Sequence, residues 1–242
     1  MLQSYAKKLY ICSTKLKKYM SIQTTIAEIS QSLPLGTRLV AVSKYHPASM
    51  IQEAYDGGQR IFGENLVQEM QQKHEILPKD IEWHFIGHLQ TNKVKYIAPY
   101  VSLIHAVDSL KLMQEIEKQA AKANRTIRIL LQLHVAQEET KFGFTPEECE
   151  AMLEEGAWKS LSHIEIAGIM CMASNVDDEA QIAREFDKAH TFFLHAQSRF
   201  FANTPTFCEC SMGMSDDYPI AIQHGSTLIR VGSKIFGHRI YN

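Results

Sequence analysis

A regular alternation of short apolar segments with longer amphipathic ones limits the folds open to this chain more than any other feature. Eight apolar segments of strand length follow one another after residue 38. Their continuous apolar character is typical of strands buried on both faces, as in a parallel sheet covered by helices. We expect strands at residues 39–44, 60–63, 82–87, 103–107, 127–135, 164–172, 206–211 and 227–231.

Helical patterns fill the gaps between these strands. Asp108-Ser109 and Thr145-Pro146 are typical helix starts, and the apolar residues of the longest segment repeat at intervals of three and four. We expect helices at residues 22–32, 48–56, 65–76, 110–123, 178–201 and 216–223, with others starting near residues 91 and 145.

Eight strand–helix units in roughly 200 residues fit a single (β/α)8 TIM barrel, which belongs to the α/β class. A doubly wound open sheet is the alternative, but it usually has fewer strands, and no G-x-G-x-x-G motif follows the first strand here. We therefore predict one barrel over residues 20–242, with an N-terminal helical extension before it.

Residues 1–19 differ from the rest of the chain because they contain five lysines and no acidic residue. A presequence resembling a mitochondrial one, an extra basic helix, and translation that starts at Met20 would each account for them. We expect residues 1–19 to be a basic extension that is not part of the barrel.

The overall composition excludes several classes of protein. Lysine plus arginine number 25 and aspartate plus glutamate 27, so the net charge of −2 favours neither nucleic acid nor an anionic membrane as a partner. No apolar run reaches the roughly 18 residues of a membrane span. The five cysteines have no regular spacing and are odd in number, which is typical of free thiols in a reducing cytoplasm. No cluster has metal-ligand spacing.

The first predicted strand ends in Lys44, at the end of the barrel where active sites lie. Loss of hydration favours the neutral form of a lysine, and a neutral amine is a nucleophile toward aldehydes and ketones. The alternative is that Lys44 simply emerges into solvent at a strand end.

The ends of the seventh and eighth strands predict an anion site. Barrels commonly bind phosphate with the loops that follow these strands. Ser211 offers a hydroxyl group, and Gly232-Ser233 combines a flexible backbone with a second hydroxyl. Arg230 shares a strand face with Gly232 and lies one layer deeper. It would need an acceptor there, either in a ligand or in an internal salt bridge.

Together these features suggest one ligand with an aldehyde, a phosphate and a hydrogen-bond acceptor on a ring. Pyridoxal 5′-phosphate (PLP) has all three, with Lys44 as the amine that forms the Schiff base. An arginine opposite the pyridine nitrogen cannot accept a hydrogen bond, so that nitrogen would stay unprotonated.

Five motifs, in this order, resemble those of the pyridoxal phosphate homeostasis proteins, the YggS/PROSC family. The resemblance covers residues 22–242. The motifs are Val40-Ala-Val-Ser-Lys44, Phe62-Gly-Glu-Asn65, His84-Phe-Ile-Gly87 with Leu89-Gln-Thr-Asn-Lys93, Ser211-Met-Gly-Met-Ser-Asp-Asp217, and Gly225-Ser-Thr-Leu-Ile-Arg-Val-Gly232 with Ile235-Phe-Gly237.

The resemblance implies a barrel like the N-terminal domain of alanine racemase, with PLP on the first-strand lysine. An arginine would face the pyridine nitrogen, strands seven and eight would bind the phosphate, and an asparagine would lie near the cofactor. The residues that match these positions are Lys44, Asn65, Ser211, Arg230, Gly232 and Ser233. His88 departs from the pattern, because the family often has proline there.

The resemblance also bears on catalysis. Racemases of this type take a second acid or base from a further β domain and a partner subunit, and this sequence ends at Asn242, directly after the barrel. We therefore expect a PLP carrier of PLP homeostasis without robust catalysis of its own. A single-domain PLP-dependent racemase or lyase that uses Lys44 as its base is the alternative, and a cofactor-free Schiff-base aldolase is a third. We expect a cytoplasmic monomer or weak dimer whose partners are PLP and PLP-dependent apoenzymes.

Overall fold

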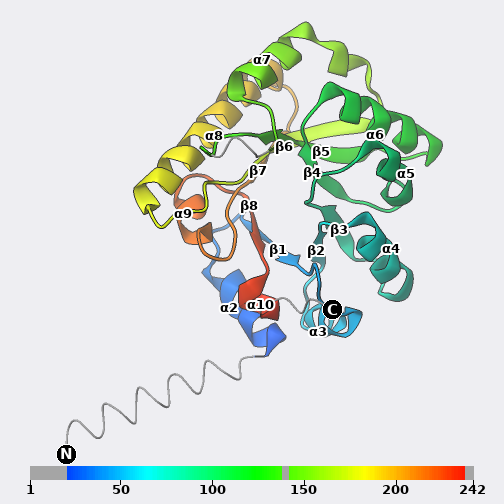
Figure 1. The fold of residues 1–242 in the computed structure, drawn as a ribbon, viewed down its shortest axis with the longest axis vertical. Helices are drawn as coiled ribbons and strands as arrows, with labels where there is room; N and C mark the ends of the chain where they lie inside the picture. Colours follow the sequence, from blue (N-terminus) through cyan, green and yellow to red (C-terminus); the bar gives the residue numbers. More distant parts are fainter. Residues whose placement is uncertain (1–20, 138–141, 238–242) are drawn as a thin grey trace, which may run out of the picture.

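The computed structural model describes residues 21–137 and 142–237. Over these residues, eight parallel strands pair in chain order and β8 closes on β1, so the sheet forms a barrel (Figure 1). The predicted (β/α)8 fold is confirmed, and ring closure excludes the open doubly wound sheet. The predicted basic extension, residues 1–19, lies outside the described residues.

The strands are short, and seven of them lie close to their predicted positions. Their bounds are β1 (Arg38–Val42), β2 (Ile61–Glu64), β3 (Glu82–Phe85), β4 (Leu103–Val107), β5 (Ile127–Leu133), β6 (Ile164–Cys171), β7 (Glu209–Ser211) and β8 (Leu228–Val231).

The helices follow the strands around the outside of the barrel. The predicted starts at Ser109, Thr145 and Asp178 are all helix caps, and Thr145 forms a full capping box with Glu148. The helices are α2 (Ile22–Ser32), α3 (Ala48–Asp56), α4 (Val67–Ile76), α5 (Val94–Ile97), α6 (Leu110–Lys122), α7 (Pro146–Glu155), α8 (Glu179–Phe200), α9 (Tyr218–Gln223) and α10 (Ser233–Phe236), with 3₁₀ turns at Thr91–Lys93 and Ala157–Ser160.

Strand β7 is shorter than the predicted strand at 206–211. Phe207 lies before it, and its ring stacks on Phe201 at 4.1 Å and on Phe193 at 5.2 Å between ring centroids. These contacts hold the chain against α8 just before β7 begins. Cys208 is exposed, whereas Cys210 is buried in the strand.

The apolar core has two layers. The larger layer lies between the strands and the surrounding helices, and a smaller cluster of seven buried residues fills part of the barrel interior. That inner cluster consists of Val40, Leu103, Ala106, Leu130, Ala167, Met170 and Leu228. The rest of the interior is polar, which is unusual for a packed barrel centre and leaves charged groups to be accounted for.

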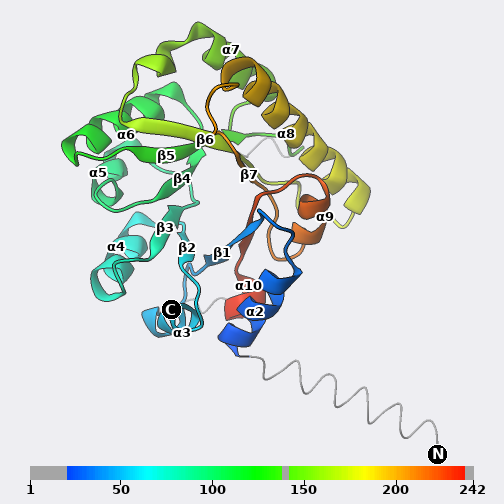
Figure 2. The same ribbon diagram turned by 180° about the vertical axis from the view of Figure 1, so that it is seen from behind.

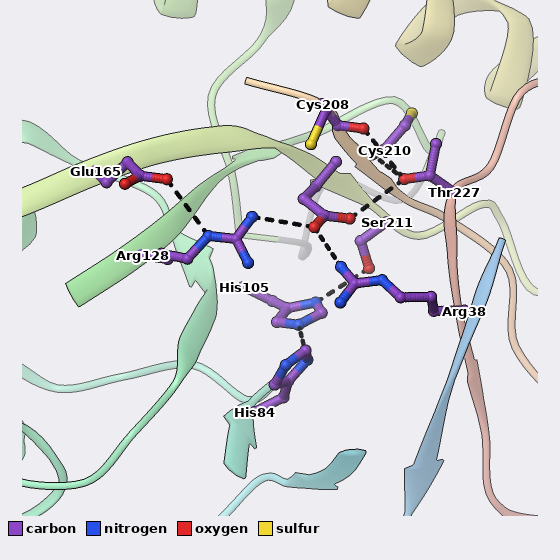
Figure 3. A network of polar contacts seen from close by, with 10 residues as sticks. Arg38, His84, His105, Arg128, Glu165, Cys208, Cys210, Ser211 and Thr227 are labelled. Carbon is purple, nitrogen blue, oxygen red and sulfur yellow. Dashed lines mark hydrogen bonds and ion pairs between the residues drawn. The ribbon is translucent and has the colours of Figure 1, made fainter. Parts of the chain in front are cut away.

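The N-terminal end of the barrel is closed by an ion-pair network. The buried carboxylate of Glu209 accepts hydrogen bonds from Arg38 and from Arg128, the second at 3.1 Å (Figure 3). Arg128 also pairs with Glu165 at 3.4 Å. Because active sites of this fold lie at the opposite end, we interpret this network as structural.

Helix α2 precedes the barrel and lies beside α10, close to the end of the described chain, in both views (Figures 1 and 2). Ile22, Ile26 and Ile29 form its buried face. The two helices thus join the beginning and the end of the described chain. Within the described ranges, no helix is long and apolar enough to cross a membrane.

Candidate functional site

A cavity of about 270 Å³ opens at the C-terminal ends of the strands. Five of the six predicted site residues line it, and they come from the ends of β1, β2 and β8: Lys44, Asn65, Arg230, Gly232 and Ser233. Chain folding therefore brings together residues that lie far apart in the sequence. The sixth, Ser211, does not line this cavity.

Lys44 lies in a tight turn directly after β1. The amide N–H of His46 donates to the carbonyl of Ser43 at 3.1 Å, which makes Lys44 and Tyr45 the two central residues of the turn. Tyr45 has a φ angle of 65°, a left-handed conformation that glycine or asparagine normally adopts at this turn position. Lys44 itself is half-buried. The turn, and not the strand, carries the lysine.

A buried network behind this turn was not anticipated from the sequence. The Nζ of Lys73 donates to the carbonyl of Ser43 at 2.8 Å and to the carboxylates of Glu64 and Glu69 at 2.7 Å each. The Ser43 hydroxyl donates to Glu64 at 2.6 Å, and the Tyr45 amide donates to Glu69 at 2.6 Å. The residues before and after Lys44 are therefore both held by one network.

Two carboxylates share one ammonium group in this network, so it is not electrically balanced. Burial raises the pKa of Glu64 to about 7, although the positive charge of Lys73 acts in the opposite direction. The Oε2 atom of Glu64 has no hydrogen-bond partner among the described residues. Proton binding by Glu64 near neutral pH would relieve part of the excess negative charge.

Arg230, which comes from β8, also lines the cavity and is 4% exposed. Its Nη1 donates to the carbonyl and the hydroxyl of Ser211, at 2.8 and 2.6 Å, and its Nη2 donates to the carbonyl of Cys171 at 2.9 Å. No carboxylate among the described residues forms an ion pair with it, so the internal salt bridge considered as an alternative is not seen. Burial lowers the pKa of Arg230 because no counter-charge is in contact.

Ser211 faces the barrel interior and is fully buried. Its hydroxyl lies 3.0 Å from His105 Nδ1, and His105 Nε2 lies 3.0 Å from His84 Nδ1 (Figure 3). Burial lowers the pKa of His84 to about 3 and that of His105 well below its usual value, so both rings are neutral. The Ser211 hydroxyl contacts Arg230 and His105 and lies outside the cavity lining, so its predicted role as a phosphate ligand stays a prediction.

Ser215, four residues further on, lines the cavity in place of Ser211. Its hydroxyl accepts the Gly232 N–H at 3.2 Å, which joins the loops after β7 and β8. A Cβ on Gly232 would approach the Val42 carbonyl to 3.1 Å, so a glycine lets β8 end close to β1. The motif at residues 211–217 contains both serines. They differ in position, because Ser211 points into the barrel from β7, whereas Ser215 lies in the following loop and lines the cavity.

Asn65 completes the cavity on the β2 side. Its Oδ1 atom is buried and has no hydrogen-bond partner among the described residues. The loop after β3 packs against it, because a Cβ on Gly87 would come within 2.5 Å of the Asn65 carbonyl oxygen. An unpartnered buried acceptor at a cavity wall is a position that a ligand donor can satisfy.

His88, the residue that departs from the family pattern, lies in this same β3 loop. Its ring stacks on Phe142 with centroids 4.1 Å apart, and its Nδ1 lies 3.2 Å from Asp108. It therefore links the loops after β3, β4 and β5. His88 does not line the cavity.

Comparison with solved structures defines the class of barrel. Residues 19–240 match the family model of the alanine racemase N-terminal domain. The barrel superposes on alanine racemase from E. faecalis with a TM-score of 0.71, at 19% identity over 90% of this chain and 57% of the racemase. These likenesses define a barrel of the alanine racemase N-terminal class.

More similar relatives define the family. The pyridoxal phosphate homeostasis protein of Aquifex aeolicus is 38% identical over 84% of this chain and 88% of its own length, and that of Bos taurus is 37% identical over 91% and 84%. PipY of Synechococcus elongatus, solved with PLP bound, has a TM-score of 0.81 at 36% identity over 90% of this chain and all of PipY. The chain belongs to the family of pyridoxal phosphate homeostasis proteins.

Proposed function

We propose that this protein binds PLP as a Schiff base on Lys44 and acts in PLP homeostasis as a carrier, without robust catalysis of its own. The observation that carries the proposal is the meeting of Lys44, Arg230 and the Ser215–Gly232 pair around one cavity at the C-terminal end of the barrel. Known relatives named for this function share most of the chain.

The residues around the cavity fit the chemical groups of PLP. The cofactor supplies an aldehyde that condenses reversibly with an amine. Lys44 would provide that amine, and Arg230, which no carboxylate of the described residues contacts, would face the pyridine nitrogen. The unpartnered Oδ1 of Asn65 would accept a hydrogen bond from a ring hydroxyl.

The hydroxyls of Ser215 and Ser233, together with backbone N–H groups near Gly232, would hold the phosphate. Asp216 also lines the cavity and is exposed, so its carboxylate would have to stay in solvent when an anion binds. The cavity is slightly smaller than the lower end of the usual range for ligand pockets, about 300 Å³, which suits a compact single-ring ligand.

The alternative is a single-domain PLP-dependent racemase or lyase in which Lys44 is the base. Such chemistry needs a second proton donor or acceptor across the ring. Among the described lining residues, only His46 and Asp216 could exchange protons besides Lys44, and His46 lies two residues from the lysine in the same turn. No tyrosine lines the described part of the cavity. This composition favours the carrier.

Borohydride trapping tests the Schiff base directly. Purified protein is titrated with PLP, its visible absorbance is recorded, and the adduct is reduced and located by peptide mass spectrometry. We expect the reduced adduct on the peptide that contains Lys44, its loss in Lys44→Ala, and its retention in the control variant Lys95→Ala on α5. An adduct that persists unchanged in Lys44→Ala would refute the proposed attachment site.

Incubation with L-alanine and with D-alanine in the presence of PLP separates the carrier from the enzyme. The carrier predicts a slow exchange of bound PLP and no interconversion above the rate of free PLP. Rapid turnover that disappears in Lys44→Ala would favour the racemase or lyase. Transfer is tested in parallel, by mixing the PLP-loaded protein with a PLP-dependent apoenzyme and following the recovery of that enzyme's activity.

A further inference from the structure

We propose that Glu69 is a positioning residue that, together with Lys73, holds the turn at Tyr45 and so presents Lys44 to the cavity. The inference rests on the proposed function for the role of Lys44. It concerns a contact on the outside of the barrel, between α4 and the turn after β1.

The turn needs an external support because its conformation is unfavourable for the residue that it contains. Tyr45 occupies the third position of the turn with a φ of 65°. A side chain with a Cβ is disfavoured there, whereas glycine and asparagine adopt this conformation readily. If Tyr45 relaxed to an ordinary φ, the chain direction at Lys44 would change with it.

Glu69 supplies this support through its carboxylate. One oxygen, Oε1, accepts the Tyr45 N–H at 2.6 Å and the Lys73 ammonium at 2.7 Å. Because Lys73 also binds the Ser43 carbonyl and the Glu64 carboxylate, Glu69 cannot move freely. The backbone is thus held on both sides of Lys44 by groups of β2 and α4.

The contact lies where water can reach it. Tyr45, Glu69 and Lys73 line a second cavity on the outer side of the turn. The Glu69 side chain is 18% exposed, whereas Glu64 is fully buried. Glu69 can therefore be replaced without leaving a void in the apolar core, and water would compete for the Tyr45 amide once the carboxylate is gone.

Amide hydrogen exchange tests the inference on the cofactor-free protein. We expect Glu69→Ala to increase the exchange rate of the Tyr45 amide at least about tenfold, because its acceptor is lost. The control variant Glu75→Ala, which removes an exposed carboxylate from the same helix, should leave that rate unchanged. Equal protection of Tyr45 in wild type and in Glu69→Ala would overturn the inference.

PLP titration then measures the consequence for Lys44. We expect Glu69→Ala to weaken PLP binding about tenfold. Glu69→Gln should lose much less PLP affinity, because its amide oxygen can still accept the Tyr45 N–H. Equal losses in both variants would mean that the charge of Glu69 matters and not its contact with the turn, and would overturn the inference.

A double-mutant cycle with Tyr45→Asn isolates the turn itself. Asparagine tolerates the left-handed conformation, so the effect of Glu69→Ala on PLP binding should be smaller when it is combined with Tyr45→Asn than in wild type. An undiminished effect would contradict the inference. Absence of any Lys44 adduct in wild type would instead refute the proposed function, while the hydrogen-exchange result would still decide whether Glu69 holds the turn.

Discussion

Two buried cations, Lys73 behind the turn at Lys44 and Arg230 in the cavity wall, are compensated differently. Lys73 contacts two carboxylates, Glu64 and Glu69. Among the described residues, Arg230 contacts only neutral acceptors, namely two backbone carbonyls and the Ser211 hydroxyl. The behaviour of a buried charge depends on such partners, because the cost of removing it from water must be offset by something in contact.

The difference assigns the two cations different roles. The positive charge of Lys73 is balanced by the carboxylates of Glu64 and Glu69. We therefore interpret Lys73 as a residue that fixes the turn that carries Lys44. Among the described residues no carboxylate contacts Arg230, and Asp217 favours its charged form without an ion pair, so the charge remains available to a ligand in the cavity. The histidines below Arg230 are consistent with this, since burial keeps both neutral and neither adds a second positive charge beside it.

The largest expected effect comes from removing the compensated cation. Lys73→Met leaves two carboxylates beside the turn with no positive partner. We expect it to lower the free energy of unfolding by about 3–5 kcal/mol, measured by urea denaturation. Adding Glu64→Gln should recover part of this loss. A loss below about 1 kcal/mol would mean that the network does not hold the turn.

The pH dependence of stability tests the charge imbalance around Lys73. Because folding raises the pKa of Glu64 from 4.5 to about 7, its contribution is fully present below pH 4.5 and is lost as the pH rises to about 7. The upper limit of this loss is between about 3 and 4 kcal/mol, at about 1.4 kcal/mol per pKa unit. The free energies of unfolding of wild type and of Glu64→Gln, measured at about pH 5 and at about pH 8, should differ by an amount that changes with pH. A constant difference would contradict the raised pKa.

Removing the uncompensated cation should cost less stability and affect the ligand more. Arg230→Gln leaves carbonyls without a full set of donors but no unpaired charge, so we expect a loss of about 1–3 kcal/mol. The Lys44 adduct should still form, with a shifted visible spectrum, because the group facing the ring nitrogen has changed. Arg184→Gln, on the exposed face of α8, is the control. An unchanged spectrum in Arg230→Gln would place this residue away from the ring.

The smallest expected effect distinguishes the two serines. Ser215→Ala removes a hydroxyl from the cavity wall, and we expect PLP binding to weaken about tenfold. Ser211→Ala removes a hydroxyl from the barrel interior, and we expect a change in PLP affinity of less than about threefold. Titration of both variants with PLP measures their affinities. The opposite order would restore Ser211 as the phosphate-binding serine.

Local patterns in the sequence were sufficient to predict the repeating units and the cavity-lining residues at strand ends. These features depend on residues that are close to one another in the sequence. They include the apolar strands, the helix caps and the strand-end positions of Lys44, Arg230 and Gly232. Strand β7 was predicted too long, because the stacking of Phe207 on Phe201 and Phe193 depends on α8. The sequence pointed to Ser211 and not to Ser215, because which of the two lines the cavity depends on the direction in which β7 faces.

The sequence by itself determined the barrel, the family and five of the residues that line the cavity, because each is encoded in periodicity or in contiguous motifs. Only the tertiary structure decided how the two buried cations are compensated. Lys73 donates a hydrogen bond to the Ser43 carbonyl, 30 residues away in the sequence, and Arg230 donates one to the Cys171 carbonyl, 59 residues away. Contacts of this kind arise when the barrel closes, and the electrostatics of the cavity follow from them.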